Sequence, residues 1–303
     1  MMTRRIYILL PLILLFANTF SAKSQEYCSF LKRVQEYQKG VKLLDHKNDE
    51  CNPAEVDTTT FNIKTYLSLF DQLRLVPNRE LWLCNFYGYS AGQPIMYVRP
   101  KDFKEDVYFL QAQKKFNAQM DSILGARSII YSKDSSTKKE LAFIKKWVDR
   151  QKSCFTPTAA LIQYARDSVN RAEYNFIPND TKNGFIQLLF FNRMGSRFAL
   201  YWHSNYQLMS IICDQQDVQY HLADCQKQGS NMTFEEEKFK EQSLIDVSPK
   251  VSVSNDAYYI EWYEFEFHEG LYKRSFKIER QAPYRITLVR EERVVKTTVN
   301  YFY

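Results

Sequence analysis

The sequence predicts an α+β protein, in which a helical N-terminal half packs on an antiparallel β-sheet formed largely by the C-terminal half. Apolar residues recur near helical spacing in the first half, whereas the last fifty residues read as strand-like runs joined by short turns. Strands connected this closely pair antiparallel. Aromatic residues make up 16% of the chain and there are only 8 glycines, which favours packed sheets over glycine-rich nucleotide loops.

The first half is predicted to contain five helices and one hairpin. Apolar stripes predict helices near 30–41, 60–73, 109–125 and 141–148, and Thr156-Pro157 is a typical start for a fifth. Gly40, Pro77 and Gly125 are expected at or just past the ends of the first three. Two strand-like runs, 81–87 and 94–98, flank a Gly/Ser turn and predict a hairpin.

The pattern becomes strand-like after Gly184. Strands are predicted over 185–192, 197–202 and 208–213, followed by a short helix over 215–225 and a long polar loop over 227–243. The final strands are expected at 257–268, 272–279, 284–290 and 294–303. We treat residues 25–303 as a single globular region with a sub-boundary near 175–184.

The first 24 residues have the order of a secretory signal peptide. Two arginines precede an apolar run, Ile6–Phe16, which is shorter than the about 20 residues that a spanning helix needs. Small and polar residues follow, and Ala22 and Ser24 predict cleavage before Gln25. An earlier cleavage site and an uncleaved anchor are the alternatives. The expected location is therefore the periplasm, the cell envelope or the exterior.

Charge and motifs exclude several function classes. The net charge is +6, but half of it belongs to Arg4, Arg5 and Lys23 in the signal peptide. A mature chain this close to neutral is not expected to bind nucleic acid. No membrane span is expected once the signal is removed. The four histidines are scattered and no H-E-x-x-H motif occurs, so we expect no metal site and no cofactor.

Six cysteines follow the predicted cleavage site, and none forms a C-x-x-C motif. An oxidising compartment permits disulfides. Cys28–Cys51 and Cys213–Cys225 are the predicted bridges, because each pair closes a modest loop within a region expected to fold together. The alternative is that several cysteines remain buried thiols, as the apolar runs around Cys84 and Cys213 would suit.

One segment matches a catalytic motif. Residues 88–92 read G-Y-S-A-G, the G-x-S-x-G pattern of the serine hydrolases, in which a strand turns sharply into a helix to project the serine. Here a β-like run closed by Pro100 follows. We therefore interpret Ser90 as a hairpin-loop residue and keep a serine hydrolase, with Ser90 as nucleophile and His203 as base, as the alternative. A helix after Gly92 would support the enzyme, and a strand would support the hairpin.

Aromatic residues supply the candidate binding surface. His203 ends an aromatic run at 200–206, where it would serve as a general base, as part of a sugar-stacking cluster or as a packed corner residue. In the strand at 258–268, alternation predicts that aromatic side chains point inward and Glu264 and Glu266 outward, with a glycosidase carboxylate pair as the alternative. The residues predicted to bind a partner are Trp202, His203, Tyr206, Trp262 and Tyr263.

The exit sequence 22–25 (A-K-S-Q) and the segment 195–206 (G-S-R-F-A-L-Y-W-H-S-N-Y) resemble those of uncharacterised exported proteins of Gram-negative bacteria. The resemblance implies export and brings no activity that could be transferred to particular residues. We expect a non-catalytic binding or structural protein. Its partner is unknown, and a carbohydrate or another envelope component would suit its aromatic side chains.

Overall fold

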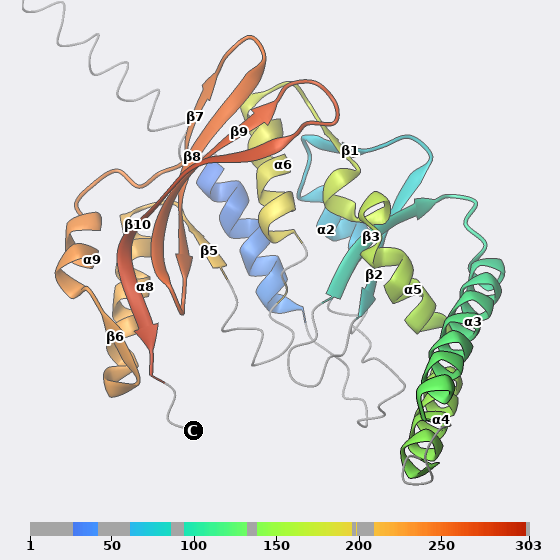
Figure 1. Ribbon diagram of the computed structural model, residues 1–303. Helices are drawn as coiled ribbons and strands as arrows, with labels where there is room; N and C mark the ends of the chain where they lie inside the picture. The colour runs from blue at the N-terminus through green and yellow to red at the C-terminus, as the bar shows by residue number, and fades with distance from the viewer. Residues whose placement is uncertain are drawn as a thin grey trace, which may run out of the picture. The chain divides into compact units, whose positions relative to one another are not determined.

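The computed structural model describes residues 27–41, 61–85, 94–131, 138–195, 198 and 209–300. It is a mixed α+β structure, as predicted: helices lie mostly within 27–242, and residues 209–299 form a six-stranded antiparallel, curled sheet (Figure 1). The chain divides into two compact units. Unit 1 comprises Met1–Lys42, Thr58–Arg74 and Phe176–Tyr303, and unit 2 comprises Leu43–Asp57 and Leu75–Asn175.

The sheet belongs to unit 1. Its strand order is β5-β8-β9-β10-β6, and β7 pairs with β8. The strands are β5 (Met209–Ile212), β6 (Met232–Phe234), β7 (Lys250–Val253), β8 (Ala257–Glu266), β9 (Gly270–Glu279) and β10 (Ile286–Val299). Strand β10 replaces two predicted strands, because two register shifts against β9 let one bent strand continue through both segments. Gly270 starts β9 with a φ of 119°, which favours glycine.

Five α-helices of unit 1 fall within the described residues: one over residues 27–40, α2 (Ile63–Ser68), α6 (Lys182–Met194), α8 (Gln215–Lys227) and α9 (Glu236–Gln242). A single-turn 3₁₀ helix, Gly229–Asn231, follows α8. Helix α6 corrects the strand predicted over 185–192. Thr181 caps it by accepting a hydrogen bond from the Gly184 N–H, and its apolar residues are buried nearly all round. A short, continuous apolar run does not distinguish a buried helix from a strand.

Two other predictions in unit 1 need correction. The predicted polar loop over 227–243 contains β6 and α9, since Phe239 anchors α9 with no exposed side-chain surface. The second helix is shorter than predicted, because Asn62 caps α2 at Lys64 and Thr65 and Leu73 already belongs to β1 (Leu73–Leu75). Strand β1 forms a two-stranded sheet with β4 (Phe176–Pro178).

Helices cover both faces of the sheet in unit 1. Phe185 of α6 stacks on Tyr258 of β8 with ring centroids 4.0 Å apart, and His221 of α8 stacks on Phe265 of β8 at 4.2 Å. Positions 258 and 265 lie on opposite faces of a strand, because side chains alternate. Both faces of β8 are therefore buried, and the prediction that Glu264 points outward is wrong: its side chain has no exposed surface.

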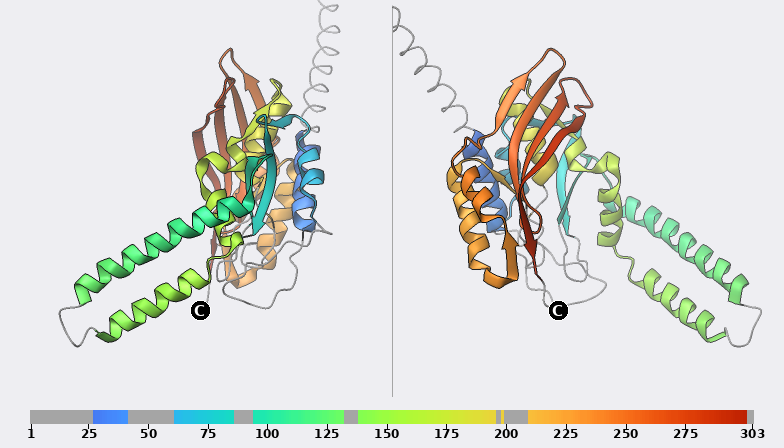
Figure 2. Two further views of the ribbon diagram at one scale, coloured as in Figure 1. Left: turned by 90° about the vertical axis from the view of Figure 1, so that its right-hand side faces the viewer. Right: turned by 60° about the vertical axis from the view of Figure 1, so that its left-hand side comes forward.

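Unit 2 contains the predicted hairpin strands and three helices. Strands β2 (Arg79–Asn85) and β3 (Pro94–Pro100) pair antiparallel throughout their length. Helices α3 (Glu105–Tyr131) and α4 (Lys138–Ser153) lie side by side in opposite directions (Figure 2), and α5 (Pro157–Arg166) begins after its Thr156 cap. Helix α3 continues past Gly125, which corrects its predicted end. Two single-turn 3₁₀ helices, Ser168–Asn170 and Ala172–Tyr174, follow α5.

Candidate functional site

A buried ion-pair cluster lies on the α6 side of the sheet in unit 1. Glu264 on β8, Arg274 on β9 and Arg193 near the end of α6 meet there. Register explains how the sequence brings them together, because Trp262 pairs with Arg274 across the two strands and Glu264 lies two residues further along the same face. Arg193 reaches the cluster from the last turn of α6, which packs on β8.

The Glu264 carboxylate is fully committed to this cluster. Its Oε1 accepts hydrogen bonds from the Trp262 indole N–H at 2.8 Å and from the Arg193 Nε at 3.3 Å. Its Oε2 accepts from the Arg193 Nη2 at 2.8 Å and from the Arg274 Nη1. A buried charge is tolerated when it is paired and hydrogen-bonded in this way.

Arg274 links the buried carboxylate to two others that are nearer the surface. Its Nη1 also donates to Glu266 at 2.6 Å, and its Nε donates to Glu291 at 2.6 Å. Burial acts to lower the pKa of Arg274, but attraction to Glu264 and the hydrogen bonds to the carboxylates outweigh it and raise the pKa. The cluster thus holds two permanent cations against three carboxylates. Because Glu264 shares Arg274 with Glu266 and is closed to solvent, the pair is not arranged to flank a substrate.

The structure shows what the predicted binding residues Trp262 and Tyr263 do. Trp262 is 0% exposed and supports Glu264, while Tyr263 is buried on the opposite face with Phe265 and Leu271. Both act as core residues, which corrects the expectation that they present contact surface. The other predicted residues, Trp202, His203 and Tyr206, lie outside the described part of the chain. Sequence reasoning missed Arg193 and Arg274, because neither belongs to a local pattern that marks a buried arginine.

The predicted disulfides are also corrected. Cys28, Cys213 and Cys225 are free, buried thiols, so neither Cys28–Cys51 nor Cys213–Cys225 is bridged. The Cys28 thiol instead donates a hydrogen bond to the Cys213 carbonyl at 3.3 Å, which places this pair near, but not at, disulfide distance. Cys51 lies outside the described residues. Cys154 is disulfide-bonded.

Close to this thiol pair, ion pairs of Lys32 link the first helix to the start of α8. Lys32 lies 2.7 Å from Asp214, the residue that caps α8, and 3.4 Å from Asp217 in its first turn. Burial acts to lower the pKa of Lys32, but the two carboxylates outweigh it and raise the pKa. Hydrogen bonding to Cys28 and burial raise the pKa of Cys213, so its thiol is a poor nucleophile at neutral pH.

The serine-hydrolase alternative lacks the element that its motif needs. Ser90 itself and His203 lie outside the described residues. The segment after Gly92 is the strand β3, which begins at Pro94 and pairs with β2. A nucleophile elbow opens a helix, since its oxyanion hole uses the N–H that follows the serine. A strand at this place favours the hairpin interpretation.

Helix α4 of unit 2 exposes two large aromatic side chains. Phe143 is 72% exposed and Trp147 41% exposed. At 100° per residue, Phe143 lies about 130° from the centre of the less exposed stripe of Leu141, Ile144 and Val148, and Trp147 lies about 90° from it, at the stripe's flank. Trp147 was predicted to join that stripe, but it precedes Val148 by one residue and is therefore rotated out of it.

Cations accompany these two rings. Lys139 and Lys146 are exposed on the same face of α4 as Phe143, and Glu140 lies at the edge of that face. We call Lys139, Phe143, Lys146 and Trp147 the outer face of α4. The whole helix carries six Lys or Arg residues and two acids. One of the six cations, Lys152, contacts Asp121 on α3 at 2.5 Å. Helix α3, in contrast, has three cations and three acids.

Another exposed tryptophan of unit 2 is already engaged. Trp82 on β2 is 39% exposed, and the Arg99 guanidinium lies 3.4 Å from the centre of its ring. Arg99 is in turn paired with Glu80 at 3.0 Å and Glu105 at 3.2 Å. By comparison, Phe143 and Trp147 stack on no ring or cation within the described part of unit 2. The two rings on the outer face of α4 are thus exposed without a partner of the kind that Trp82 has.

In the ranges that the structure describes, no helix is long and apolar enough to cross a membrane, and no three His, Cys, Asp or Glu side chains gather as a metal site. No protein-family model matches the sequence, and neither a curated protein nor a solved structure matches it. The class defined by fold and surface is a two-unit α+β protein with a basic, aromatic helix on unit 2.

Proposed function

We propose that this is an exported, non-catalytic binding protein of the cell envelope, and that the outer face of α4 is its contact surface. The observation that carries the proposal is the exposure of Phe143 and Trp147 beside Lys139 and Lys146. Large apolar side chains grouped on a surface mark interaction sites. The most buried charged side chains of unit 1, Glu264 and Arg274, pair with each other in the Glu264 cluster. Their pairing supports a structural role for the cluster rather than a catalytic one.

Export is supported by the signal-peptide pattern of the first 24 residues. Sequencing the N-terminus of the protein recovered from outside the cytoplasm tests it. We expect the mature chain to begin at or near Gln25. A chain that begins at Met1 and stays in the inner membrane would contradict export.

Binding is tested by sedimenting the mature protein with an envelope fraction from the cells that make it. Much less of the variant Phe143→Ala/Trp147→Ala than of the unchanged protein should sediment with the envelope fraction. Val107→Ala/Leu110→Ala on α3 is the matched control, because both of those side chains are also exposed in unit 2. Equal sedimentation of the two variants and the unchanged protein would show that α4 is not the contact surface.

A further inference from the structure

We infer that the partner of the outer face of α4 is the anionic surface of a phospholipid membrane, on which the helix lies flat. This inference rests on the proposed function and names its partner. The first argument is the concentration of charge. Six cations against two acids give α4 a net charge of +4 by itself, whereas the entire 303-residue chain carries +6. A basic surface attracts anionic lipid headgroups and gains from their negative potential.

The second argument is the mixture of side chains. Helices that bind in the membrane interface combine Lys and Arg with Trp, Phe or Leu. On α4, Phe143 and Trp147 lie next to Lys139 and Lys146. Tryptophan prefers the headgroup level, and lysine keeps its ammonium group in water while its alkyl stem covers apolar surface. These four side chains are thus suited to one depth in the interface.

The third argument is shape and length. Helix α4 has 16 residues and packs on α3 (Figure 2), and the four side chains of its outer face are exposed along one ridge of the helix. Such a helix is about 24 Å long, and a ridge of this kind contacts a plane along its whole length. At the neighbouring end of α3, Ile129 and Ile130 are more than half exposed and add apolar surface.

A second copy of this chain fits the surface less well. Pairing two outer faces of α4 would bring Lys139 and Lys146 of both copies together, and like charges in contact oppose association. The ammonium groups of these lysines make no ion pair within the described residues, so their charge is available to an anionic surface.

The test is sedimentation of the mature chain with vesicles of phosphatidylcholine alone or with about one third phosphatidylglycerol. We expect binding to the anionic vesicles only, and release of the protein at about 0.5 M salt. Phe143→Ala/Trp147→Ala and Lys139→Glu/Lys146→Glu should each weaken binding about tenfold or more. All four side chains are exposed, so the variants should keep the circular dichroism spectrum and melting temperature of the unchanged protein.

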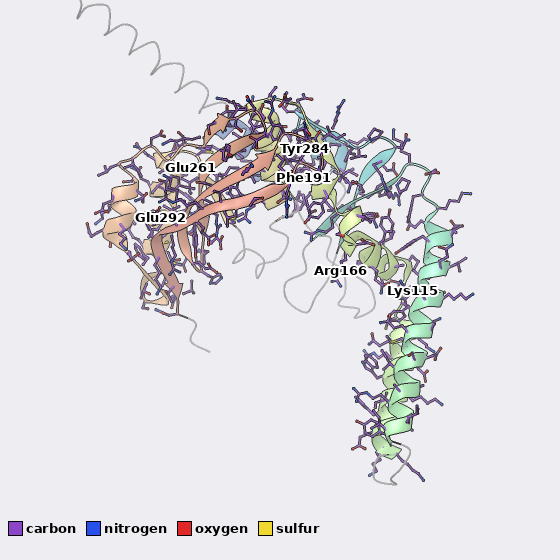
Figure 3. The ribbon with its side chains drawn as sticks, turned by 45° about the horizontal axis from the view of Figure 1, so that its top comes forward. Lys115, Arg166, Phe191, Glu261, Tyr284 and Glu292 are labelled. Atoms are coloured by element: carbon purple, nitrogen blue, oxygen red, sulfur yellow. The ribbon has the colours of Figure 1, made fainter. Side chains whose placement is uncertain are left out.

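Matched controls come from α3. Val107→Ala/Leu110→Ala removes exposed apolar surface, and Lys114→Glu/Lys115→Glu reverses two exposed charges (Lys115 is labelled in Figure 3). Both should bind within about twofold of the unchanged protein, because α3 has no excess of cations. Bromine-labelled lipids allow a measurement on the unchanged protein. They should quench the fluorescence of Trp147, and this quenching should disappear in Trp147→Phe.

Several results would overturn the inference: no binding to anionic vesicles, equal binding to both vesicle types, or an equal loss in the α3 controls. If envelope sedimentation depends on α4 while anionic vesicles do not bind, the proposed function stands and its partner is a protein or a carbohydrate. If the envelope sedimentation does not depend on α4, the proposed function itself fails.

Discussion

Glu264 is the residue on which the interior of the sheet most depends. Two guanidinium groups and the Trp262 indole point at a carboxylate with no exposed surface. Removing one partner of a buried ion pair leaves the opposite charge uncompensated, which costs about 3 kcal/mol or more. We therefore expect Glu264→Gln to lower the free energy of unfolding by about that amount, measured by urea denaturation.

Glu266→Gln is the matched control for this prediction. Glu266 pairs with the same Arg274 at 2.6 Å, but its side chain is partly exposed, so water replaces much of what the pair contributes. Glu266→Gln should therefore lower the free energy of unfolding by about 1 kcal/mol or less. Equal losses in the two variants would show that Glu264 is not held as an ionised, buried partner.

His221 gives the stability of unit 1 a pH dependence. Burial, with a smaller contribution from Lys39, lowers the pKa of His221 from 6.5 to about 4 in the folded protein. Between pH 6.5 and 4 the unfolded chain binds a proton that the folded chain does not, so stability falls as the pH falls through this range. Once the pH is below 4, this difference in proton binding has lowered the free energy of unfolding by about 3 kcal/mol in total.

The corresponding variant is His221→Phe, whose ring preserves the stacking on Phe265. We expect its unfolding free energy to vary less between pH 6.5 and 4 than that of the unchanged protein, while the two vary in parallel above pH 7. Carboxylates titrate in the same range in both proteins, so the difference between the two profiles isolates His221. Identical profiles would mean that His221 becomes protonated in the folded state.

At the scale of elements, the first turn of α6 depends on a glycine. Thr181 accepts the Gly184 N–H at 3.0 Å, and a Cβ on Gly184 would overlap the backbone carbonyl of Asn179. We expect Gly184→Ala to destabilise the protein by about 2 kcal/mol, because backbone atoms move only at a cost. Thermal denaturation followed by circular dichroism measures this.

Gly125 in α3 is the opposite case and serves as control. It lies in the interior of a helix with nothing within 4 Å of the position of a Cβ. Gly125→Ala should therefore leave stability unchanged or increase it by up to about 1 kcal/mol, the difference in helix propensity. A stability of Gly184→Ala equal to that of the unchanged protein would contradict the close approach at Gly184.

Elements whose ends are marked by a capping residue, a proline or a turn sequence could be predicted from the sequence. Thr156-Pro157 correctly marks the start of α5, and the runs on either side of the Gly/Ser turn form β2 and β3. The run of α6 could not be assigned, because nine of its thirteen residues are buried and periodicity is lost. Likewise the pairing of Arg274 with Glu264 depends on the register of β8 with β9 and on the packing of α6, neither of which has a local signature.

At the scale of the whole molecule, most of unit 2 is inserted into unit 1 at a single place. The chain passes into it at Leu75 and out of it at Asn175. These two connections are adjacent, because the Val76 N–H donates to the Asn175 carbonyl at 3.0 Å and β1 is a neighbour of β4. An insertion with adjacent ends leaves the host free to fold alone.

We therefore expect a chain in which residues 76–175 are replaced by a short Gly/Ser linker to retain the fold of unit 1. A short linker adds little loop-closure entropy when the ends already lie together. Urea denaturation followed by tryptophan fluorescence should show one cooperative transition, and Glu264→Gln should destabilise the shortened chain as much as the complete one. The shortened chain should also lose binding to the envelope fraction, because it lacks α4. A broad, non-cooperative transition would show that unit 1 needs the inserted residues to fold.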